Sequence, residues 1–532
     1  MNGFSRIDRP SVLWATSAAS LLIAVQIASK ACRDALFLAH HGVEHLPLMM
    51  GSSAILAVLA VLFVARLFSR HGPKRIVPIA LFISGSLFFC EWLLFAWSPK
   101  QISILLYLHV ATLGAVTISG FWSVISERFD PHTAKRSIAT ISAGAAFGGV
   151  LGGLLADRIS AMLGIGPILF TLAALSLIAT TMVSRIGTRA SGEAQELNAP
   201  RSGLNLLRHE PHLQNMGFVV ILVGASATLI DYAFKAEAAR VIRTETELVS
   251  FFALFYTAAG LITFGVQTTF CQKLLKHFGV GLSLSLLPLT VLAGGLIGTA
   301  WTKLWSLTIV RGTESALSHS VYRSSYELLY SPVADHLKRP TKTLIDVGCS
   351  RLGDVLGALL VVGLIALDAS RAVSYSMLAA SVAAAITIAL VVRVRRGYIA
   401  TLIRRLRTGA LRHSESSLLP GAPRTHSTND HAALLQSALD PWLERNTADL
   451  LVRAMLESDQ RLQGTALELL DEMVPISLRQ TVSKILESAQ REPRTGSSKR
   501  EKVERLLASM RSLHLESPPP GYTNGIAALP KS

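Results

Sequence analysis

Apolar residues dominate long stretches of this chain between about residue 12 and residue 393, and polar residues gather in short segments between them. A helix rises about 1.5 Å per residue, so stretches of this length can cross a hydrocarbon core about 30 Å thick. We therefore predict an all-helical membrane protein. The predicted spans are residues 12–36, 46–66, 76–97, 102–126, 137–156, 161–183, 214–234, 249–270, 279–300, 304–329, 343–366 and 373–392. We expect the first and the seventh, which carry charges, to be broken or polar-ended.

One apolar sequence occurs twice. Residues 148–155 read Gly-Gly-Val-Leu-Gly-Gly-Leu-Leu, and residues 353–360, which lie 205 positions later, read Gly-Asp-Val-Leu-Gly-Ala-Leu-Leu. A repeat of this period in a hydrophobic chain predicts two halves of six helices each. Transporters of the major-facilitator architecture are built from parallel repeats of this kind, with the substrate site between the halves. Glycines four residues apart let helix backbones approach closely, so we expect these stretches to be packing surfaces.

Basic residues are concentrated in alternate loops between the predicted spans. They are Arg66, Arg70, Lys74 and Arg75; Arg128, Lys135 and Arg136; Arg185, Arg189, Arg201 and Arg208; Lys273 and Lys276; Lys338, Arg339 and Lys342. By the positive-inside rule these loops face the cytoplasm, which places both termini there and predicts a protein of the bacterial inner membrane. In a soluble protein the net charge of +16 would suggest nucleic acid as a partner, but here topology explains it, and we expect the lipid bilayer instead.

Composition divides the chain into six segments. We predict an N-terminal six-helix bundle at residues 1–190, a cytoplasmic linker at 191–213, a C-terminal six-helix bundle at 214–396, a basic segment and flexible linker at 397–430, a cytoplasmic helical domain at 431–514 and a disordered tail at 515–532. The basic segment is either a helix on the anionic leaflet or the positive flank of the last span. The helical domain has apolar residues at helical spacing, which suggests a HEAT-like fragment that binds a protein partner.

The sequence contains no enzyme signature. It has no phosphate-cradling GxxxxGK[ST] motif, no nucleophile elbow and no paired CxxC, so we expect neither an enzyme nor a cofactor. His40, His41, Glu44 and His45 could be pictured as metal ligands, but they are more typical of an ordinary polar loop, and we predict no metal site.

Ionisable residues inside apolar spans carry the functional signal. A charge at the middle of a bilayer costs about 2.5–3.5 kcal/mol on insertion scales, so such residues usually face a cavity or a partner. Lys30, Arg33 and Asp34 end the first span, and Asp231 and Lys235 end the equivalent span of the second half. Lys30 and Asp34 are four residues apart, as are Asp231 and Lys235, so each pair could bond across one helical turn. We expect these residues to line a cavity, with self-neutralised helix ends as the alternative.

Four more ionisable residues lie late in the second half. Glu327 is in the tenth span, and Asp346, Arg351 and Asp354 are in the eleventh. Arg351 and Asp354 are three residues apart and could pair. We interpret the group as part of a polar translocation path, with an internal structural salt bridge as the rival interpretation.

Several motifs, taken in order, resemble the ATP/ADP translocase family of nucleotide transporters. They are residues 30–38 (Lys-Ala-Cys-Arg-Asp-Ala-Leu-Phe-Leu), 121–122 with 134–136, 231–235 (Asp-Tyr-Ala-Phe-Lys), 326–332 (Tyr-Glu-Leu-Leu-Tyr-Ser-Pro), Lys342, 345–347 (Ile-Asp-Val) and 351–353 (Arg-Leu-Gly). The resemblance covers roughly residues 12–392. It implies a twelve-helix major-facilitator-like fold and the exchange of anionic nucleotides.

The chain departs from the family pattern at three positions. Asp354 and Tyr326 stand where the family has Lys, and Thr133 stands where it often has an acid. A basic-to-acidic change in a polyphosphate path repels the substrate, which argues against strict ATP/ADP exchange.

These observations lead to one main hypothesis and two alternatives. The main hypothesis is a secondary transporter that alternates access by rocking two halves, in which Arg33, Lys235 and Arg351 attract a small anionic solute, either a nucleotide or a related phosphorylated metabolite. The acidic residues complete pairs or couple protons; they are Asp34, Asp231, Glu327 and Asp354. The alternatives are a proton-coupled carrier of an unrelated solute and a non-transporting membrane scaffold with a cytoplasmic interaction domain.

Overall fold

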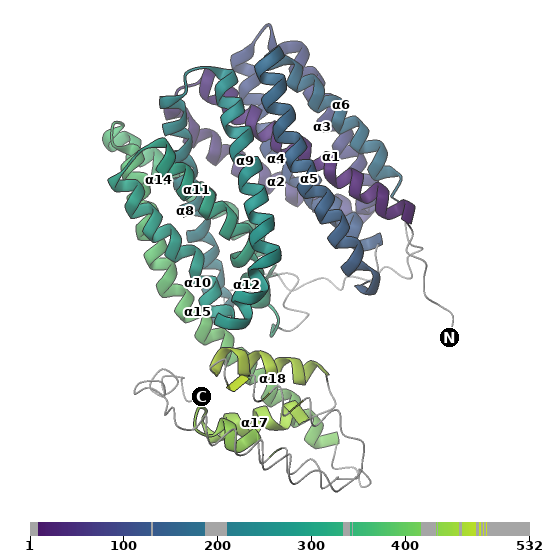
Figure 1. Ribbon diagram of the computed structural model, residues 1–532, viewed down its shortest axis with the longest axis vertical. Coiled ribbons are helices and arrows are strands. Elements are labelled where there is room, and N and C mark those ends of the chain that lie inside the picture. Colours follow the sequence, from purple (N-terminus) through teal and green to yellow (C-terminus); the bar gives the residue numbers. More distant parts are fainter. Residues whose placement is uncertain are drawn as a thin grey trace. The chain divides into compact units, whose positions relative to one another are not determined.

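The computed structural model describes residues 9–128, 131–186, 210–333, 341–342 and 344–416, and residues 432–486 apart from 433–434, 457–459, 475–477, 480–481 and 483–485 (Figure 1). The predicted tail at 515–532 and most of the predicted linker at 191–213 lie outside these residues. The α-helices are α1 (Arg9–His40), α2 (Leu46–His71), α3 (Pro73–Phe95), α4 (Pro99–Arg128), α5 (Pro131–Leu163), α6 (Gly166–Ser184), α8 (Pro211–Val241), α9 (Glu245–Thr269), α10 (Cys271–Ala300), α11 (Leu304–Leu317), α12 (Arg323–Leu328), α14 (Ser350–Asp368), α15 (Ala372–Ser416), α17 (Arg445–Leu456) and α18 (Gln460–Met473). Three short segments have other helical forms. η1 (Val43–His45) is a 3-10 helix, and η2 (Ser318–Tyr322) and η3 (Leu344–Cys349) are π-helices.

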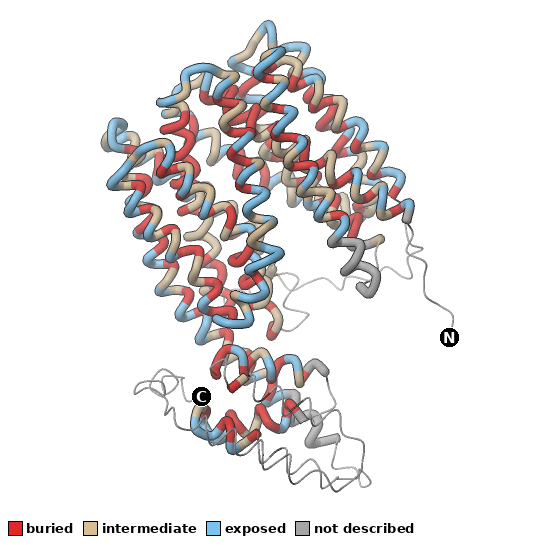
Figure 2. Tube along the Cα trace, in the orientation of Figure 1, coloured by how far each residue is buried: buried red, intermediate tan, exposed pale blue. Residues whose placement is uncertain are grey.

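The described part of the chain is entirely helical, as predicted, and eleven of its helices are long and apolar enough to cross a membrane. Large apolar side chains such as Leu59 and Phe63 of α2 are exposed, which suits a surface that faces lipid. Figure 2 shows exposed and buried positions alternating along the helices. The tenth predicted span, residues 304–329, is not one helix. It is divided into α11, η2 and α12, because the chain passes through a π-helical turn at Ser318–Tyr322.

Of the two forms expected for the first and seventh spans, broken or polar-ended, the broken form is not observed: α1 and α8 run without interruption through their charged residues. The helix of the last predicted span continues past residue 392, because α15 runs as one helix to Ser416. Residues 397–416 therefore belong to the same helix as the last predicted span.

The described residues form two compact bodies, which we treat separately. The first contains residues 1–271, 285–323 and 339–390, and the second contains residues 272–284, 324–338 and 391–532. The predicted domain boundaries stay predictions.

The repeated glycine sequence plays the same role twice in the first body. α5 packs along α1, and α14 packs along α8. An added Cβ at Gly148 would overlap the backbone of Ser20 on α1, and one at Gly353 would overlap the backbone of Ile221 on α8. The equivalent glycines of the two copies therefore bring equivalent helix pairs into backbone contact, as the spacing predicts. α5 also contacts α9, and α14 also contacts α2, so these four helices join the first predicted half to the second.

In the second body, α18 packs on the beginning of α10 and on the end region of α15. α10 is kinked at Gly279, whose φ of +70° is a left-handed conformation that favours glycine. The helix restarts after the kink, and one oxygen of the Glu472 carboxylate accepts the backbone N–H of Val280 and, at 3.4 Å, that of Gly281. The other oxygen lies 3.4 Å from Nε of Arg395 on α15. Glu472 thus satisfies N–H groups at a helix start that would otherwise lack partners.

A second carboxylate of α18 makes a similar attachment. The Tyr398 hydroxyl of α15 donates to Glu468, and the Ser331 hydroxyl donates to the same carboxylate at 2.9 Å. Of the helices predicted in this region, α17 and α18 are present. The described contacts of Glu468 and Glu472 attach α18 to α10, to α15 and to Ser331 of the same chain. A HEAT-like repeat and a protein partner stay predictions.

Candidate functional site

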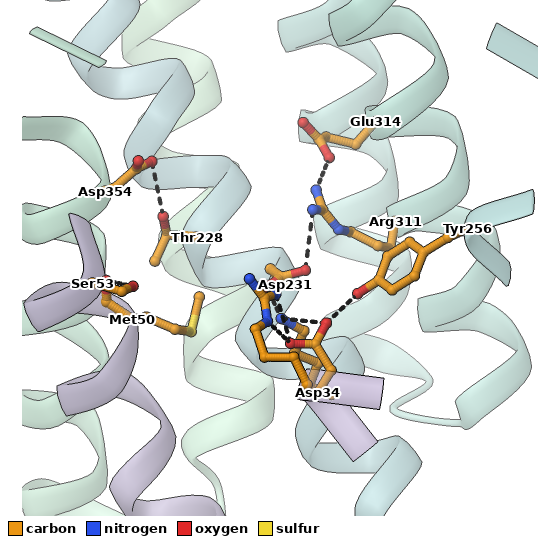
Figure 3. Close-up of polar contacts among 11 residues, drawn as sticks. Asp34, Met50, Ser53, Thr228, Asp231, Tyr256, Arg311, Glu314 and Asp354 are labelled. Carbon is orange, nitrogen blue, oxygen red and sulfur yellow. Dashed lines mark hydrogen bonds and ion pairs between the residues drawn. The ribbon is translucent and has the colours of Figure 1, made fainter. Parts of the chain in front are cut away.

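A buried network of ion pairs links four helices of the first body, and Asp34 of α1 is at its centre (Figure 3). One oxygen of the Asp34 carboxylate lies 2.6 Å from the guanidinium of Arg33. The other lies 3.2 Å from the Lys235 ammonium of α8 and accepts the hydroxyl of Tyr256 from α9 at 2.6 Å. Asp34 and Lys235 are each only 1% exposed. The network therefore joins the first predicted half to the second through a single carboxylate.

The network continues from α8 to α11. The Lys235 ammonium lies 2.7 Å from the Asp231 carboxylate, one turn earlier on α8. The Asp231 carboxylate also lies 3.0 Å from the Arg311 guanidinium of α11, and Arg311 in turn donates to Glu314. Charged partners therefore alternate in sign from Arg33 to Glu314.

Two tyrosine rings cover the cationic groups. The Arg33 guanidinium lies 4.6 Å from the ring centroid of Tyr107 on α4. The Lys30 ammonium lies 4.1 Å from the ring centroid of Tyr256. Both distances are within the range of cation–π attraction.

The network carries an excess of positive charge. Burying an ion pair is tolerated when each charge has a close partner of opposite sign. The basic members are Lys30, Arg33, Lys235 and Arg311, and the acidic members are Asp34, Asp231 and Glu314. Among the described residues, no carboxylate lies within ion-pair distance of Lys30. The site is therefore one negative charge short of neutrality.

The structure separates the predicted helical-turn pairs into those that form and those that do not. The pair Asp231–Lys235 forms, and so does Arg351–Asp354, at 2.8 Å. The pair Lys30–Asp34 does not form, because Asp34 turns toward Arg33 and Lys235 while Lys30 lies over Tyr256. A spacing of four residues permits a contact, but Asp34 has two closer cations, its sequence neighbour Arg33 and Lys235 of α8.

The remaining predicted site residues do not join the network. Asp354 pairs with Arg351 and lies 3.5 Å from the Thr228 hydroxyl, away from Asp231 in Figure 3. Asp346 lies 3.4 Å from Arg323, whose side chain is half-exposed. Glu327 belongs to α12 in the second body. For Arg351 and Asp354, the geometry matches the internal salt bridge that the sequence left open as the rival interpretation.

Sequence analysis missed four members of the site. Arg311 and Glu314 are ionisable residues three positions apart inside the tenth predicted span, so the rule that singled out Glu327 could have found them. Tyr107 and Tyr256 carry no comparable signal, because a tyrosine in an apolar span is usually a packing residue.

A cavity of about 270 Å³ lies beside the network, between α1, α5 and α9. Its walls are mostly apolar; they include Ile23 and Ile27 of α1, Gly149 of α5, and Tyr256, Gly260 and Phe264 of α9. The Tyr256 side chain therefore belongs both to the cavity wall and to the network. No cluster of three or more His, Cys, Asp or Glu side chains suited to a metal ion occurs among the described residues.

Comparisons with solved structures establish the fold. A point mutant of the nucleoside transporter NupG superposes with a TM-score of 0.58 at 11% sequence identity, over 73% of this chain and 99% of that one. A bacterial homologue of the human lysosomal transporter Spinster, in an inward-facing unoccupied conformation, gives a TM-score of 0.54 at 14% identity, over 74% and 99%. The chain thus has the major-facilitator fold, and eleven helices of its described part are long and apolar enough to cross a membrane. This confirms the predicted fold class.

Sequence comparisons give a distant and partial similarity. The chain is 25% identical over 177 residues to ADP,ATP carrier protein 2, chloroplastic, of Arabidopsis thaliana, and 25% identical over 177 residues to the plastidic ATP/ADP-transporter of Solanum tuberosum. Each match covers 30% of this chain and only 28% of the relative. No protein-family model matches the chain.

Proposed function

We propose that the chain is a secondary-active transporter of the inner membrane, with both termini in the cytoplasm, that exchanges an anionic solute by alternating access. A nucleotide or a related phosphorylated metabolite is the proposed solute. The observation that carries the proposal is the network itself, which bridges the two predicted halves and has one positive charge in excess. The partial similarity to plastidic ATP/ADP carriers supports the nucleotide class.

The network suggests how an anion and the motion of the halves are coupled. Asp34 is the carboxylate through which α1 holds Lys235 of α8. An anionic group that reaches Lys235 can replace Asp34 as its partner while Asp34 keeps Arg33, because phosphate and carboxylate oxygens accept the same charge-assisted hydrogen bonds. The bridge between the halves then opens while both cations stay paired. A ligand drives a conformational change only by binding one state better, and this exchange of partners supplies the difference.

The same contacts explain why a carrier without substrate stays closed at the Asp34–Lys235 contact. Opening without an anion would leave Lys235 with Asp231 alone and Asp34 with Arg33 alone, and the Tyr256 hydroxyl would lose its acceptor. Leaving buried polar groups unpaired is costly, so the empty carrier opens less often than the loaded one. Obligatory exchange follows from that asymmetry.

The proposal is tested by counterflow. Purified protein is placed in liposomes that contain an unlabelled nucleotide, and entry of labelled AMP, ADP and ATP is measured against liposomes without protein. We expect entry that depends on the internal nucleotide. If no nucleotide and no other phosphorylated metabolite enters above the protein-free level, the proposed substrate class is wrong. If entry instead follows a proton gradient and ignores internal nucleotide, the chain is a proton-coupled carrier.

A further inference from the structure

The apolar cavity and the Lys30 ammonium lie on the same face of α1. Ile23 and Ile27 line the cavity, and Lys30 follows Ile27 by three residues, so the three side chains form one stripe along the helix. On the opposite side, Tyr256 of α9 lines the cavity and carries the Lys30 ammonium 4.1 Å from its ring centroid. Lys30 is not itself a lining residue of the cavity, but its ammonium lies over the ring of Tyr256, which forms part of the cavity wall.

Lys30 differs from the other cations of the network in its partners. Arg33, Lys235 and Arg311 each have a carboxylate within 3.2 Å, whereas the Lys30 ammonium lies over a tyrosine ring and feels Asp231 and Asp34 only from beyond ion-pair distance. It is also only partly buried, while Lys235 is almost fully buried. A cation with no carboxylate in direct contact attracts a further anion.

We propose that Lys30 and the cavity form one bipartite site for an organic anion with a single anionic head group and a compact body that carries a flat ring. The anion occupies this site before the exchange of partners at Lys235: the head group binds the Lys30 ammonium, and the body lies between α1, α5 and α9 against Tyr256 and Phe264. This inference rests on the proposed function and narrows it: within the nucleotides, the site favours a nucleoside monophosphate over a diphosphate or triphosphate.

Charge and volume both support this narrower class. A monophosphate carries a charge of about −1.5 to −2 at pH 7, which already offsets the one excess positive charge of the network, and each further phosphate adds charge that no described cation of the network is free to neutralise. The cavity of about 270 Å³ is slightly smaller than most ligand pockets, which usually have volumes of about 300–1,000 Å³. A flat ring system fits such a space, and aromatic side chains in its wall favour stacking.

The test is a set of dissociation constants on detergent-purified protein for five probes: AMP, ADP, ATP, adenosine and inorganic phosphate. Adenosine has the body without the charge, and phosphate has the charge without the body. We expect AMP to bind most tightly, at least about 10-fold more tightly than adenosine and than phosphate, which corresponds to about 1.4 kcal/mol for each missing part.

Two substitutions separate the two parts of the site. Lys30→Met removes the charge and should weaken AMP binding by about 10-fold or more while leaving adenosine binding unchanged. Lys30→Arg should retain AMP binding. Gly260→Leu fills the cavity, because an added Cβ there meets no atom within 4 Å. Gly260→Leu should weaken the binding of AMP and of adenosine and leave the binding of phosphate unchanged.

Matched controls use the same chemistry outside the site. Gly265 is also on α9, its added Cβ also meets no atom within 4 Å, and it is not part of the cavity wall. Gly265→Leu should therefore leave all five constants unchanged. Lys303→Met removes a charge from an exposed position and should also have no effect. Size-exclusion profiles identify any variant that fails to fold. Lys30→Gln then replaces Lys30→Met, and Gly260→Ala replaces Gly260→Leu.

The outcomes distinguish this inference from the proposed function. If ADP and ATP bind more tightly than AMP, or if Lys30→Met weakens adenosine as much as AMP, the bipartite site is wrong, although nucleotide exchange can still be measured in liposomes. If no probe binds and no nucleotide enters liposomes, the proposed function fails and this inference fails with it.

Discussion

Asparagine in place of Asp34 keeps the shape of the side chain and removes the negative charge at the centre of the network. The Lys235 ammonium is 3.2 Å from the Asp34 carboxylate, and Coulomb's law with an effective dielectric constant of about 20 gives an attraction of about 5 kcal/mol at that distance. Removing one partner of a buried pair typically costs about 3–5 kcal/mol, because the other charge stays buried. We expect Asp34→Asn and Lys235→Met each to lower the free energy of unfolding by about that amount.

The double variant should lose much less than the sum of the two single variants. Asp34→Asn with Lys235→Met removes one charge of each sign, so no new excess charge is buried. We expect a coupling energy of about 3 kcal/mol or more from a double-mutant cycle. The assay is equilibrium unfolding in mixtures of sodium dodecyl sulfate and mild detergent, which gives a free energy for each of the four proteins.

The chain offers an exposed pair as a control. Asp368 and Arg371 lie 3.8 Å apart, and their side chains are 38% and 70% exposed. The same substitutions, Asp368→Asn and Arg371→Met, should give a coupling energy below about 0.5 kcal/mol, because water screens exposed pairs. A coupling at Asp34–Lys235 as small as that of the control would refute the reasoning that this carboxylate holds the two halves together.

Three further predictions concern packing and the C-terminal helices. Gly148→Leu should prevent α5 from packing on α1 and abolish a monodisperse peak in size-exclusion chromatography. Gly363→Leu on α14, where an added Cβ meets no atom within 4 Å, should leave the peak intact. Equal profiles for the two variants would contradict the packing argument. Glu472→Gln should weaken the capping of α10 at Val280 and speed hydrogen exchange in α18 by about 5-fold or more, and an unchanged rate would show that this contact does not hold the helix. Burial raises the pKa of the Glu468 carboxyl above its ordinary value of 4.5, so the folded protein favours the neutral form of this group. The attachment of α18 is therefore strongest below pH 4.5 and weakens as the pH rises through the raised pKa. Hydrogen-exchange rates in α18, corrected for intrinsic chemistry, should increase over that range, and constant rates would contradict the prediction.

Much of the fold follows from patterns that are local in the sequence. Apolar stretches of about 20 residues must be helices in a membrane, because no other segment satisfies its own backbone there. The duplicated glycine sequence predicted close helix packing at both copies, since only small residues allow such approach, and α5 packs on α1 and α14 on α8 there. The tenth span was harder, because local hydropathy does not report the π-helical turn at Ser318–Tyr322.

The site followed from the sequence only in part. Intrahelical pairs such as Asp231–Lys235 and Arg351–Asp354 depend on spacing alone, so they could be predicted. The partners of Asp34 could not, because they depend on how α1 is rotated toward α8 and α9. The position of Lys30 over Tyr256 is set by the same rotation.

The C-terminal region shows the same limit. Periodicity predicted helices in residues 431–514, and α17 and α18 are among them. That α18 uses Glu472 to satisfy the restarted α10 could not be predicted, because it depends on the left-handed kink at Gly279 as well as on the helix itself.

The account depends most directly on Lys235 acting as the shared partner of Asp34 and of the transported anion. The measurement that tests this is the initial rate of nucleotide exchange in proteoliposomes for the wild-type protein, Lys235→Met and the exposed control Lys303→Met. We predict that Lys235→Met lowers the rate by at least about 10-fold, equivalent to about 1.4 kcal/mol, while Lys303→Met exchanges at the wild-type rate. Wild-type exchange in Lys235→Met would contradict the claim that the anion opens this bridge.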